Sequence, residues 1–148
     1  MPSTHLSLHY HIVFSTKDRE PWLAPNCRSR VHEYLGGILR NMNGVPHAVG
    51  GTGDHVHVLT GLTATHRLAD VMRELKSDSS AWIHRELSLA GFAWQEGYGG
   101  FTVGASDVER VRAYVLRQDE HHRTTTFQEE YVAMLQRGLI QYDDRYLW

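Results

Sequence analysis

The chain has 148 residues, of which 41% are hydrophobic and 22% are charged. This length and composition suit one packed domain, and we expect residues 1–148 to form it. The one cysteine, Cys27, excludes an internal disulfide and a cysteine-based zinc cluster. No apolar run approaches the roughly 18 residues that span a bilayer. The N-terminus does not resemble a signal peptide, so we expect a cytoplasmic protein with no membrane partner.

The charge balance is slightly acidic, because 15 Lys and Arg residues oppose 17 Asp and Glu residues, giving a formal net charge of −2. A protein that grips duplex DNA mainly through its phosphates is usually basic. A role in nucleic-acid binding would therefore depend on a local basic patch, a metal ion or shape. Eleven histidines are an unusual number, and since histidine is the commonest metal ligand, their placement matters.

Hydrophobic periodicity and turn residues divide the chain into strands and helices. Apolar residues alternate along the expected strands and recur every three or four positions along the expected helices. Pro25 begins one helix, while Asn43-Gly44, Gly91 and Gly138 each end one. In chain order, we expect a strand over 5–16, a helix over 25–42, strands over 45–49 and 55–62, a helix over 68–89, short strands over 92–95 and 101–103, and helices over 106–120 and 127–137.

This order of elements predicts the fold class. Strand-helix-strand-strand-helix-strand, followed by further helices, is typical of an α+β fold with a ferredoxin-like split βαβ antiparallel sheet. The short turn 50–54 forces antiparallel pairing of the second and third strands. We expect helices to cover one face of the sheet and leave the other face available, with added helices at the C-terminus.

A pair of histidines on one strand is the first candidate site. Successive side chains of a strand point to opposite faces, so His55 and His57 project together, while Val56 and Val58 point into the core. Two positions along a strand separate Cα atoms by roughly 6.6–7 Å, from which two imidazoles can converge on one cation. Taken alone, the pattern favours a metal pair no more than an ordinary half-exposed strand.

Tyr114 and Gln118 form a second candidate feature. Four positions apart on the expected helix, they share one face, although either residue alone is usually structural. A site with two histidines is incomplete, and a neutral oxygen donor would complete a site for Mg²⁺ or Mn²⁺ that holds a phosphate oxygen. A tyrosine one turn away could then attack the phosphorus.

Basic side chains near these positions are individually typical of a solvated surface. Together they could follow a strand of nucleic acid, with Trp94 and Tyr98 as stacking surfaces. The candidate DNA-binding residues are Lys17, Arg19, Arg73, Lys76, Arg117, His121, His122 and Arg123.

Several short stretches, spread in order along nearly the whole chain, resemble one known family. They are His11-Ile12-Val13-Phe14-Ser15-Thr16-Lys17, Asp54 to Leu59, Leu75-Lys76-Ser77, Tyr98-Gly99-Gly100-Phe101, Tyr114-x-x-x-Gln118-x-x-His121-His122, Phe127-Gln128-Glu129-Glu130 and Tyr142-Asp143-x-Arg145-Tyr146-Leu147-Trp148. The histidine pair resembles the HUH motif, in which two histidines flank a bulky apolar residue. The full pattern is similar to the HUH-type single-tyrosine transposases of the smallest bacterial insertion sequences and their REP-associated relatives.

The resemblance implies a role for each matching residue. His55 and His57 would bind the metal with Gln118 as the third ligand. Tyr114 would be the nucleophile that forms a covalent 5′-phosphotyrosine link with cleaved single-stranded DNA, and the freed 3′-hydroxyl would later reverse the reaction on another strand. Members of the family are homodimers, in some of which the tyrosine helix completes the partner's metal site, and they recognise imperfect hairpins.

Other interpretations fit the residues less well. A histidine-triad nucleotide hydrolase needs a third histidine where Leu59 stands, and Thr60 gives no support to a metallo-β-lactamase-type site. Rolling-circle replication initiators and plasmid relaxases share HUH chemistry but not the whole-chain pattern. The non-enzyme alternative is a domesticated protein of the same fold that binds hairpin DNA without transposing it. The alternative nucleophiles are Tyr10, Tyr131, Tyr142 and Tyr146.

Overall fold

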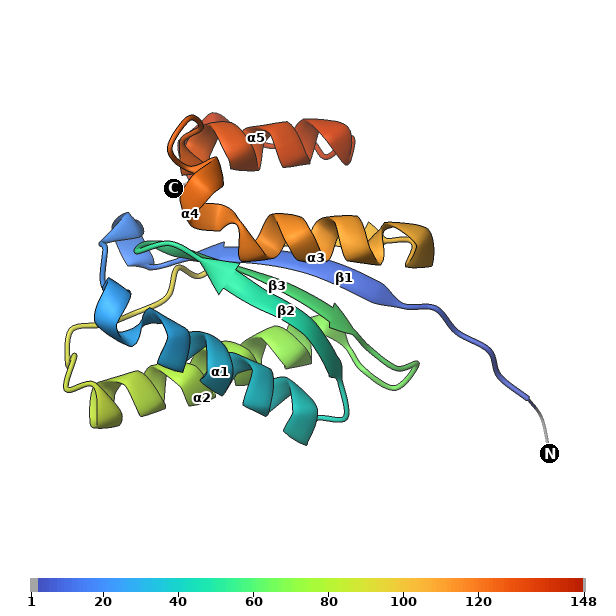
Figure 1. The fold of residues 1–148 in the computed structure, drawn as a ribbon, viewed down its shortest axis with the longest axis horizontal. Coiled ribbons are helices and arrows are strands. Elements are labelled where there is room, and N and C mark those ends of the chain that lie inside the picture. The colour runs from blue at the N-terminus through green and yellow to red at the C-terminus, as the bar shows by residue number, and fades with distance from the viewer. Residues whose placement is uncertain (1–2, 148) are drawn as a thin grey trace.

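The structure, a computed structural model, describes residues 3–147, so Met1, Pro2 and Trp148, the last residue of the expected C-terminal motif, lie outside it. Four strands form one antiparallel sheet in the spatial order β2-β3-β1-β4 (Figure 1). The sheet and its helices confirm the expected α+β fold of the ferredoxin-like kind. The strands are β1 (His9–Ser15), β2 (Val45–Gly51), β3 (His55–Gly61) and β4 (Gly99–Val103).

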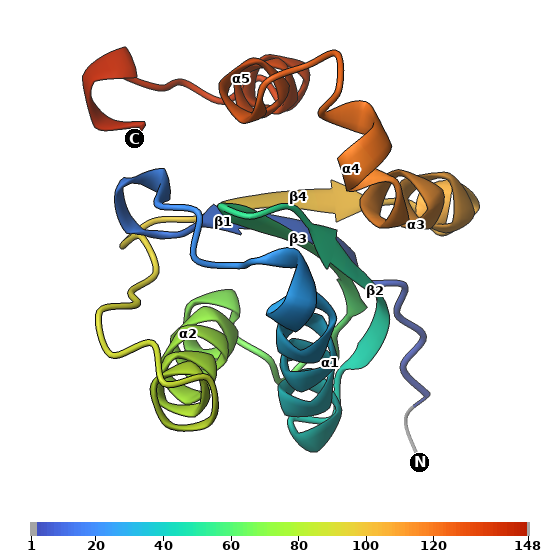
Figure 2. The same ribbon diagram turned by 60° about the vertical axis from the view of Figure 1, so that its left-hand side comes forward.

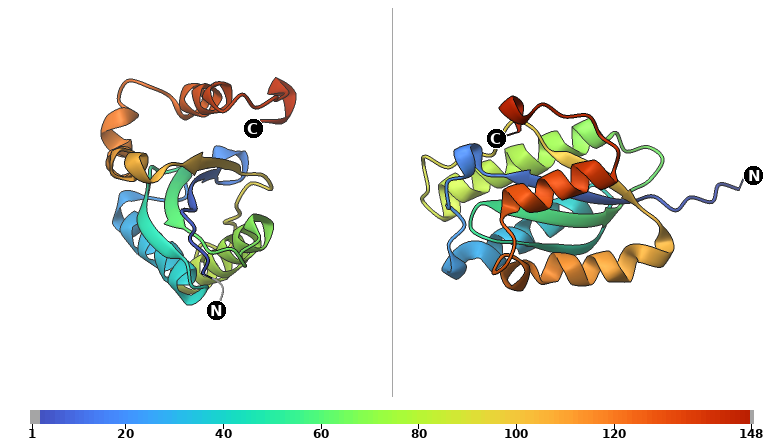
Figure 3. Two further views of the ribbon diagram at one scale, coloured as in Figure 1. Left: turned by 90° about the vertical axis from the view of Figure 1, so that its right-hand side faces the viewer. Right: turned by 90° about the horizontal axis from the view of Figure 1, so that it is seen from above.

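Helices lie on both sides of the sheet. Figure 2 shows α1 and α2 on one side and α3, α4 and α5 on the other, and Figure 3 shows α5 extending across the sheet. Among the described residues, none of the helices has the length and apolar character needed to cross a membrane. The helices are α1 (Pro25–Asn41), α2 (Leu68–Glu86), α3 (Val108–Leu116), α4 (Gln118–His121) and α5 (Phe127–Arg137), with short 3₁₀ helices η1 (Lys17–Arg19), η2 (Ala105–Asp107) and η3 (Asp144–Tyr146).

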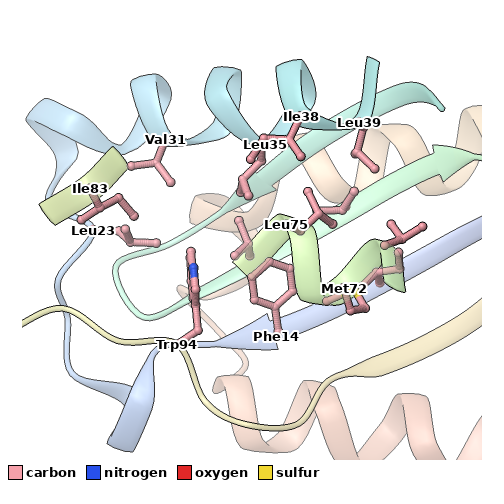
Figure 4. Close-up of a cluster of buried hydrophobic side chains, with 14 of the residues drawn as sticks. Phe14, Leu23, Val31, Leu35, Ile38, Leu39, Met72, Leu75, Ile83 and Trp94 are labelled. Carbon is pink, nitrogen blue, oxygen red and sulfur yellow. The ribbon is translucent and has the colours of Figure 1, made fainter. Parts of the chain in front are cut away.

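The main core lies between the sheet and helices α1 and α2 (Figure 4). Alternation along β1 and β3 directs Ile12, Phe14, Val56 and Val58 toward these helices, and all four are fully buried. Fully burying an apolar side chain of this size contributes about 1.5–3 kcal/mol. This face therefore fixes the register of β3, and the register directs the histidines that flank Val56 to the opposite face.

The second face of the sheet is not left available, in contrast to the expectation from the sequence. On this face, Ala48, Leu59 and Val103 form a smaller apolar cluster with Val111 and Val115 of α3. The C-terminal helices that were expected as additions therefore form a third layer, since α3 and α5 each carry an apolar stripe that must be buried.

The segment 92–95 is not the short strand that the sequence predicts. Trp94 makes only an isolated bridge with Thr16. Two backbone hydrogen bonds of 2.9 Å, from Lys17 N to Ala93 O and from Gln95 N to Ser15 O, hold the segment beside this bridge. Lys76 Nζ then fixes the following turn by donating to the carbonyl oxygens of Gln95–Gly97 at 2.7, 3.2 and 2.7 Å.

The expected helix over 106–120 is interrupted. α3 ends before Arg117, whose backbone angles (φ −107°, ψ 27°) lie outside the helical region, and α4 begins directly after it. Tyr114 and Gln118 therefore lie on two different helices rather than on one face of a single helix.

Gly50 on β2 sets how closely α3 approaches the sheet. A Cβ added at this position would collide with the backbone carbonyl of Val115. We expect Gly50→Ala to lower the free energy of unfolding by about 1–3 kcal/mol, because overpacking forces backbone shifts. Chemical denaturation measures this change. Gly37→Ala is the matched control, since nothing lies within 4 Å of a Cβ there and alanine suits a helix interior. Equal stability of Gly50→Ala and the wild type would contradict this packing.

Candidate active site

His55 and His57 lie on the face of the sheet that α3 and α5 cover. Both side chains are fully buried. Their Cα partners on β1 are Ser15 and Val13, so the histidines lie over the middle of the sheet rather than at an edge. Buried imidazoles need polar partners, and the C-terminal helices supply them.

Three polar side chains from the C-terminal helices surround the histidine pair. Gln118 begins α4, His122 follows α4, and Glu130 lies in the first turns of α5. Gln118 is 1% exposed and Glu130 is 3% exposed. An amide and a carboxylate this deeply buried must be paired, so these side chains form one polar cluster within an otherwise apolar layer.

The distances show how closely the five side chains converge. Glu130 Oε1 lies 2.9 Å from His57 Nε2 and 3.3 Å from His122 Nε2. The same oxygen lies 3.7 Å from His55 Nε2. Gln118 Oε1 lies 3.2 Å from His55 Nε2 and 3.0 Å from His122 Nε2. The three Nε2 atoms and two side-chain oxygens therefore face one small volume.

Hydrogen bonds at Nδ1, the ring nitrogen that faces away from the cluster, fix the orientation of the His55 and His122 imidazoles. His55 Nδ1 lies 2.8 Å from the Asp54 carboxylate, and His122 Nδ1 lies 2.7 Å from the Thr125 carbonyl oxygen. Both partners can only accept a hydrogen bond, so each Nδ1 carries the hydrogen. In a neutral imidazole, Nε2 then presents a lone pair to the cluster, as in metal-binding histidines held by an outer carboxylate or carbonyl.

His11 orients the third imidazole. Its Nε2 lies 2.8 Å from His57 Nδ1, and the ring is almost fully buried. Burial, together with the neighbouring charge of His57, lowers the pKa of His11 to about 3. His11 is therefore neutral at physiological pH, and its hydrogen bond with His57 Nδ1 fixes the orientation of the His57 ring, whose Nε2 faces the cluster.

The donor atoms of this cluster fit a bound metal ion. One ligand atom each from His55, His57, His122 and Glu130 lie within 4.8 Å of one another. Ligands about 2.1 Å from a shared ion lie roughly 3.0–3.4 Å apart, and the separations of 2.9–3.7 Å bracket that range. The buried cluster of three histidines and one glutamate could therefore hold a metal.

Glu130 is the electrostatic centre of the cluster. Burial opposes its ionisation, but hydrogen bonds from His122 and His57 outweigh burial and hold the pKa of Glu130 well below its ordinary range. Burial likewise opposes the charging of His122, whereas the carboxylate raises its pKa above the ordinary value. Burial dominates at His57 and lowers its pKa.

The Tyr114 hydroxyl lies directly beside this cluster, in the same chain. It donates a hydrogen bond to Glu130 Oε2 and lies 3.4 Å from His121 Nε2. Its ring meets the His57 ring edge-on at 5.7 Å. Burial and then the hydrogen bond to Glu130 raise the pKa of Tyr114 far above its ordinary value. One carboxylate therefore joins the histidines through Oε1 and the phenol through Oε2.

Helix α5 is held over the histidines by packing as well as by charge. The Phe127 ring stacks on the His55 ring with centroids 4.1 Å apart, and Phe127 also packs with Val13 of β1. The Thr126 hydroxyl caps the helix by accepting a hydrogen bond from Glu129 N at 3.2 Å. The helix that carries Glu130 therefore begins with a capped first turn directly over the histidine pair.

The candidate DNA-binding residues fall into separate groups. Arg117, His121 and Arg123 line a hollow of about 700 Å³ beside Tyr114, together with Arg110. His122 belongs to the buried cluster instead. Of the remaining four, Lys17 and Arg19 lie in η1, whereas Arg73 and Lys76 lie on α2, on the opposite side of the sheet.

Sequence reasoning did not single out Glu130 as a site residue. The signal was nonetheless present, because Glu130 lies on the apolar stripe of the expected helix over 127–137, three residues after Phe127 and four before Met134. A carboxylate on the buried stripe of a helix needs a charged or hydrogen-bonding partner. His122 was assigned to DNA binding, because nothing in the sequence indicates that its side chain lies beside His55.

Comparison with known proteins identifies the family. The profile of the family described as "Transposase IS200 like" matches residues 4–118. Since this match covers well over half of the chain, the protein belongs to the IS200-like transposase family, which confirms the resemblance drawn from the motifs. No curated protein matches the sequence.

Two solved structures share the fold. One is described as a "putative transposase from Deinococcus radiodurans R1": it is 21% identical, with a TM-score of 0.63, over 78% of this chain and 94% of that chain. The other is a REP-associated tyrosine transposase bound to a REP hairpin, 13% identical, with a TM-score of 0.54, over 78% of this chain and 70% of that chain.

The contact between Glu130 and Tyr114 predicts a change in tyrosine ionisation. In Glu130→Gln we expect the pKa of Tyr114 to fall toward its ordinary value of 10.0, since the negative charge that disfavours the phenolate is removed while burial remains. The ultraviolet absorbance of the phenolate during a pH titration, measured as the difference from each protein's Tyr114→Phe counterpart, reports this pKa. Glu129→Gln, one residue away and exposed, should titrate like the wild type. An unchanged pKa in Glu130→Gln would contradict the contact.

Proposed function

We propose that this transposase cleaves and rejoins single-stranded DNA through a covalent 5′-phosphotyrosine intermediate, with Tyr114 as the nucleophile. One observation carries the proposal: the Tyr114 hydroxyl lies beside the buried His55 and His57 pair of the same chain, joined to it through Glu130. Membership of the IS200-like transposase family supports DNA as the substrate.

The chemistry requires a polarised phosphate and a well-placed phenol. The Tyr114 oxygen bonds to phosphorus, the bond from phosphorus to the 3′-oxygen breaks, and the electron pair leaves with that oxygen. One proton leaves the phenol and one is taken up by the 3′-oxygen, so the step is balanced. Because one phosphate ester replaces another, the freed 3′-hydroxyl can reverse the step on a second strand without an external energy source.

Mg²⁺ or Mn²⁺ is the proposed cofactor, held by His55, His57 and Gln118. When bound, the divalent ion withdraws electron density from phosphorus and offsets charge on the leaving oxygen. The tyrosine needs this help, since its raised pKa makes the phenolate rare at neutral pH. Burial of the histidines excludes water from the metal side of the site.

The DNA would approach Tyr114 from the exposed hollow beside it. Arg110, Arg117 and Arg123 line this hollow and can contact backbone phosphates. The REP-associated transposase of similar fold, solved with a REP hairpin, supports hairpin-ended DNA as the partner. We propose a homodimer as the active form, in which each chain already holds its own tyrosine against its own histidines.

The covalent intermediate is directly testable. Incubated with Mn²⁺ and labelled single-stranded DNA that carries the hairpin end of its element, the wild type should form an adduct that survives a denaturing gel. Tyr114→Phe should form none, because it lacks the attacking oxygen, whereas Tyr142→Phe should react like the wild type. An adduct in Tyr114→Phe would overturn the assignment of the nucleophile.

A second variant separates cleavage from binding. His57→Ala should abolish the adduct while leaving hairpin binding largely intact, since the imidazole is buried away from the hollow. Hairpin binding by the wild type with no adduct under any divalent cation would favour the domesticated DNA-binding protein instead.

The basic hollow predicts a salt-dependent contribution to DNA affinity. Arg117→Ala and Arg123→Ala should each weaken binding of single-stranded DNA and reduce the slope of log affinity against log salt by about 0.7 for each phosphate that is no longer neutralised. Fluorescence anisotropy at several salt concentrations measures both quantities. Arg85→Ala is the control, because Arg85 lies on α2 across the sheet and pairs with Glu86. Unchanged slopes in both hollow variants would place the DNA elsewhere.

A further inference from the structure

We propose that His122 and Glu130 are also metal ligands, so that the centre has five protein donors and selects a transition-metal ion over Mg²⁺. This inference rests on the proposed function, which needs a metal at the same histidine pair. Glu130 belongs to α5, and both residues lie beyond the family match at residues 4–118.

Position is the first argument. Glu130 Oε1 and Gln118 Oε1 each lie within 3.0–3.3 Å of His122 Nε2, and Glu130 Oε1 lies 2.9 Å from His57 Nε2. These are separations expected of neighbouring ligands around one ion. Neither side chain reaches in from the surface: Glu130 is 3% exposed, and the His122 side chain is 13% exposed.

The orientation of the ring nitrogens is the second argument. His122 Nδ1 faces the Thr125 carbonyl, so its Nε2 faces the Gln118 and Glu130 oxygens. The same arrangement occurs at His55, whose Nδ1 faces the Asp54 carboxylate and whose Nε2 faces Gln118. A divalent ion would replace the protons that link these atoms in the metal-free protein, because each Nε2 and each side-chain oxygen already points into the same volume.

The donor types indicate which ion is bound. Three imidazole nitrogens, one carboxylate oxygen and one amide oxygen suit first-row transition ions such as Mn²⁺, Co²⁺ or Zn²⁺. Mg²⁺ prefers an octahedron of oxygen ligands that includes several waters, so three buried imidazoles suit it less well than they suit Mn²⁺. The additional carboxylate also neutralises one of the two positive charges of the ion in a site without solvent.

The test is metal binding by the DNA-free protein, measured by calorimetry and by the visible absorbance of Co²⁺. The wild type should bind Co²⁺ at least about 100-fold more tightly than Mg²⁺. Glu130→Gln and His122→Asn should each weaken Co²⁺ binding by about 10-fold or more. The matched control Glu129→Gln should bind like the wild type, since the Glu129 side chain is exposed and hydrogen-bonds to Thr126 rather than to the cluster.

The outcomes separate this inference from the proposed function. Wild-type Co²⁺ affinity in Glu130→Gln and His122→Asn, or equal affinity of the wild type for Mg²⁺ and Co²⁺, would overturn the five-donor centre and leave the tyrosine chemistry standing. Absence of any metal binding by the wild type would overturn both. His122→Asn carries the test by itself if thermal denaturation shows that metal-free Glu130→Gln does not fold, because it leaves the buried carboxylate in place.

Discussion

The buried carboxylate of Glu130 is the interaction on which the rest of the site depends. A charge this far from solvent is tolerated only because several hydrogen-bond donors surround it, and those donors come from a strand, a helix and the segment between helices. The same contacts hold α5 against the sheet and fix the phenol next to the imidazoles. One side chain therefore contributes both to the packing of the third layer and to the geometry of the chemical site.

The two faces of the sheet divide the work between stability and chemistry. The face toward α1 and α2 is a continuous apolar core, and it fixes which residues of β3 point the other way. The face toward the C-terminal helices mixes two small apolar clusters with the polar centre. Polar groups on this second face can therefore be replaced without changing the contacts of the main core. Functional sites on one fold can vary in this way while the scaffold stays the same.

The sequence predicts the fold class, most helix bounds and the fact that His55 and His57 point to the same face of the sheet. These features depend on local periodicity and alternation. Helix α5 begins and ends at the expected residues. The sequence does not predict the break at Arg117 or the absence of a strand at 92–95, which depend on contacts with distant segments. The site role of Glu130 was not predicted for the same reason. Its partner His57 lies 73 residues away along the chain, and only the tertiary structure brings the two together.

The break at Arg117 separates the phenol from the amide. Since this residue has non-helical backbone angles, α3 and α4 need not share one axis. α3 can therefore lie flat on the sheet, with Val111 and Val115 packed against it, while α4 turns the Gln118 amide toward the His55 imidazole.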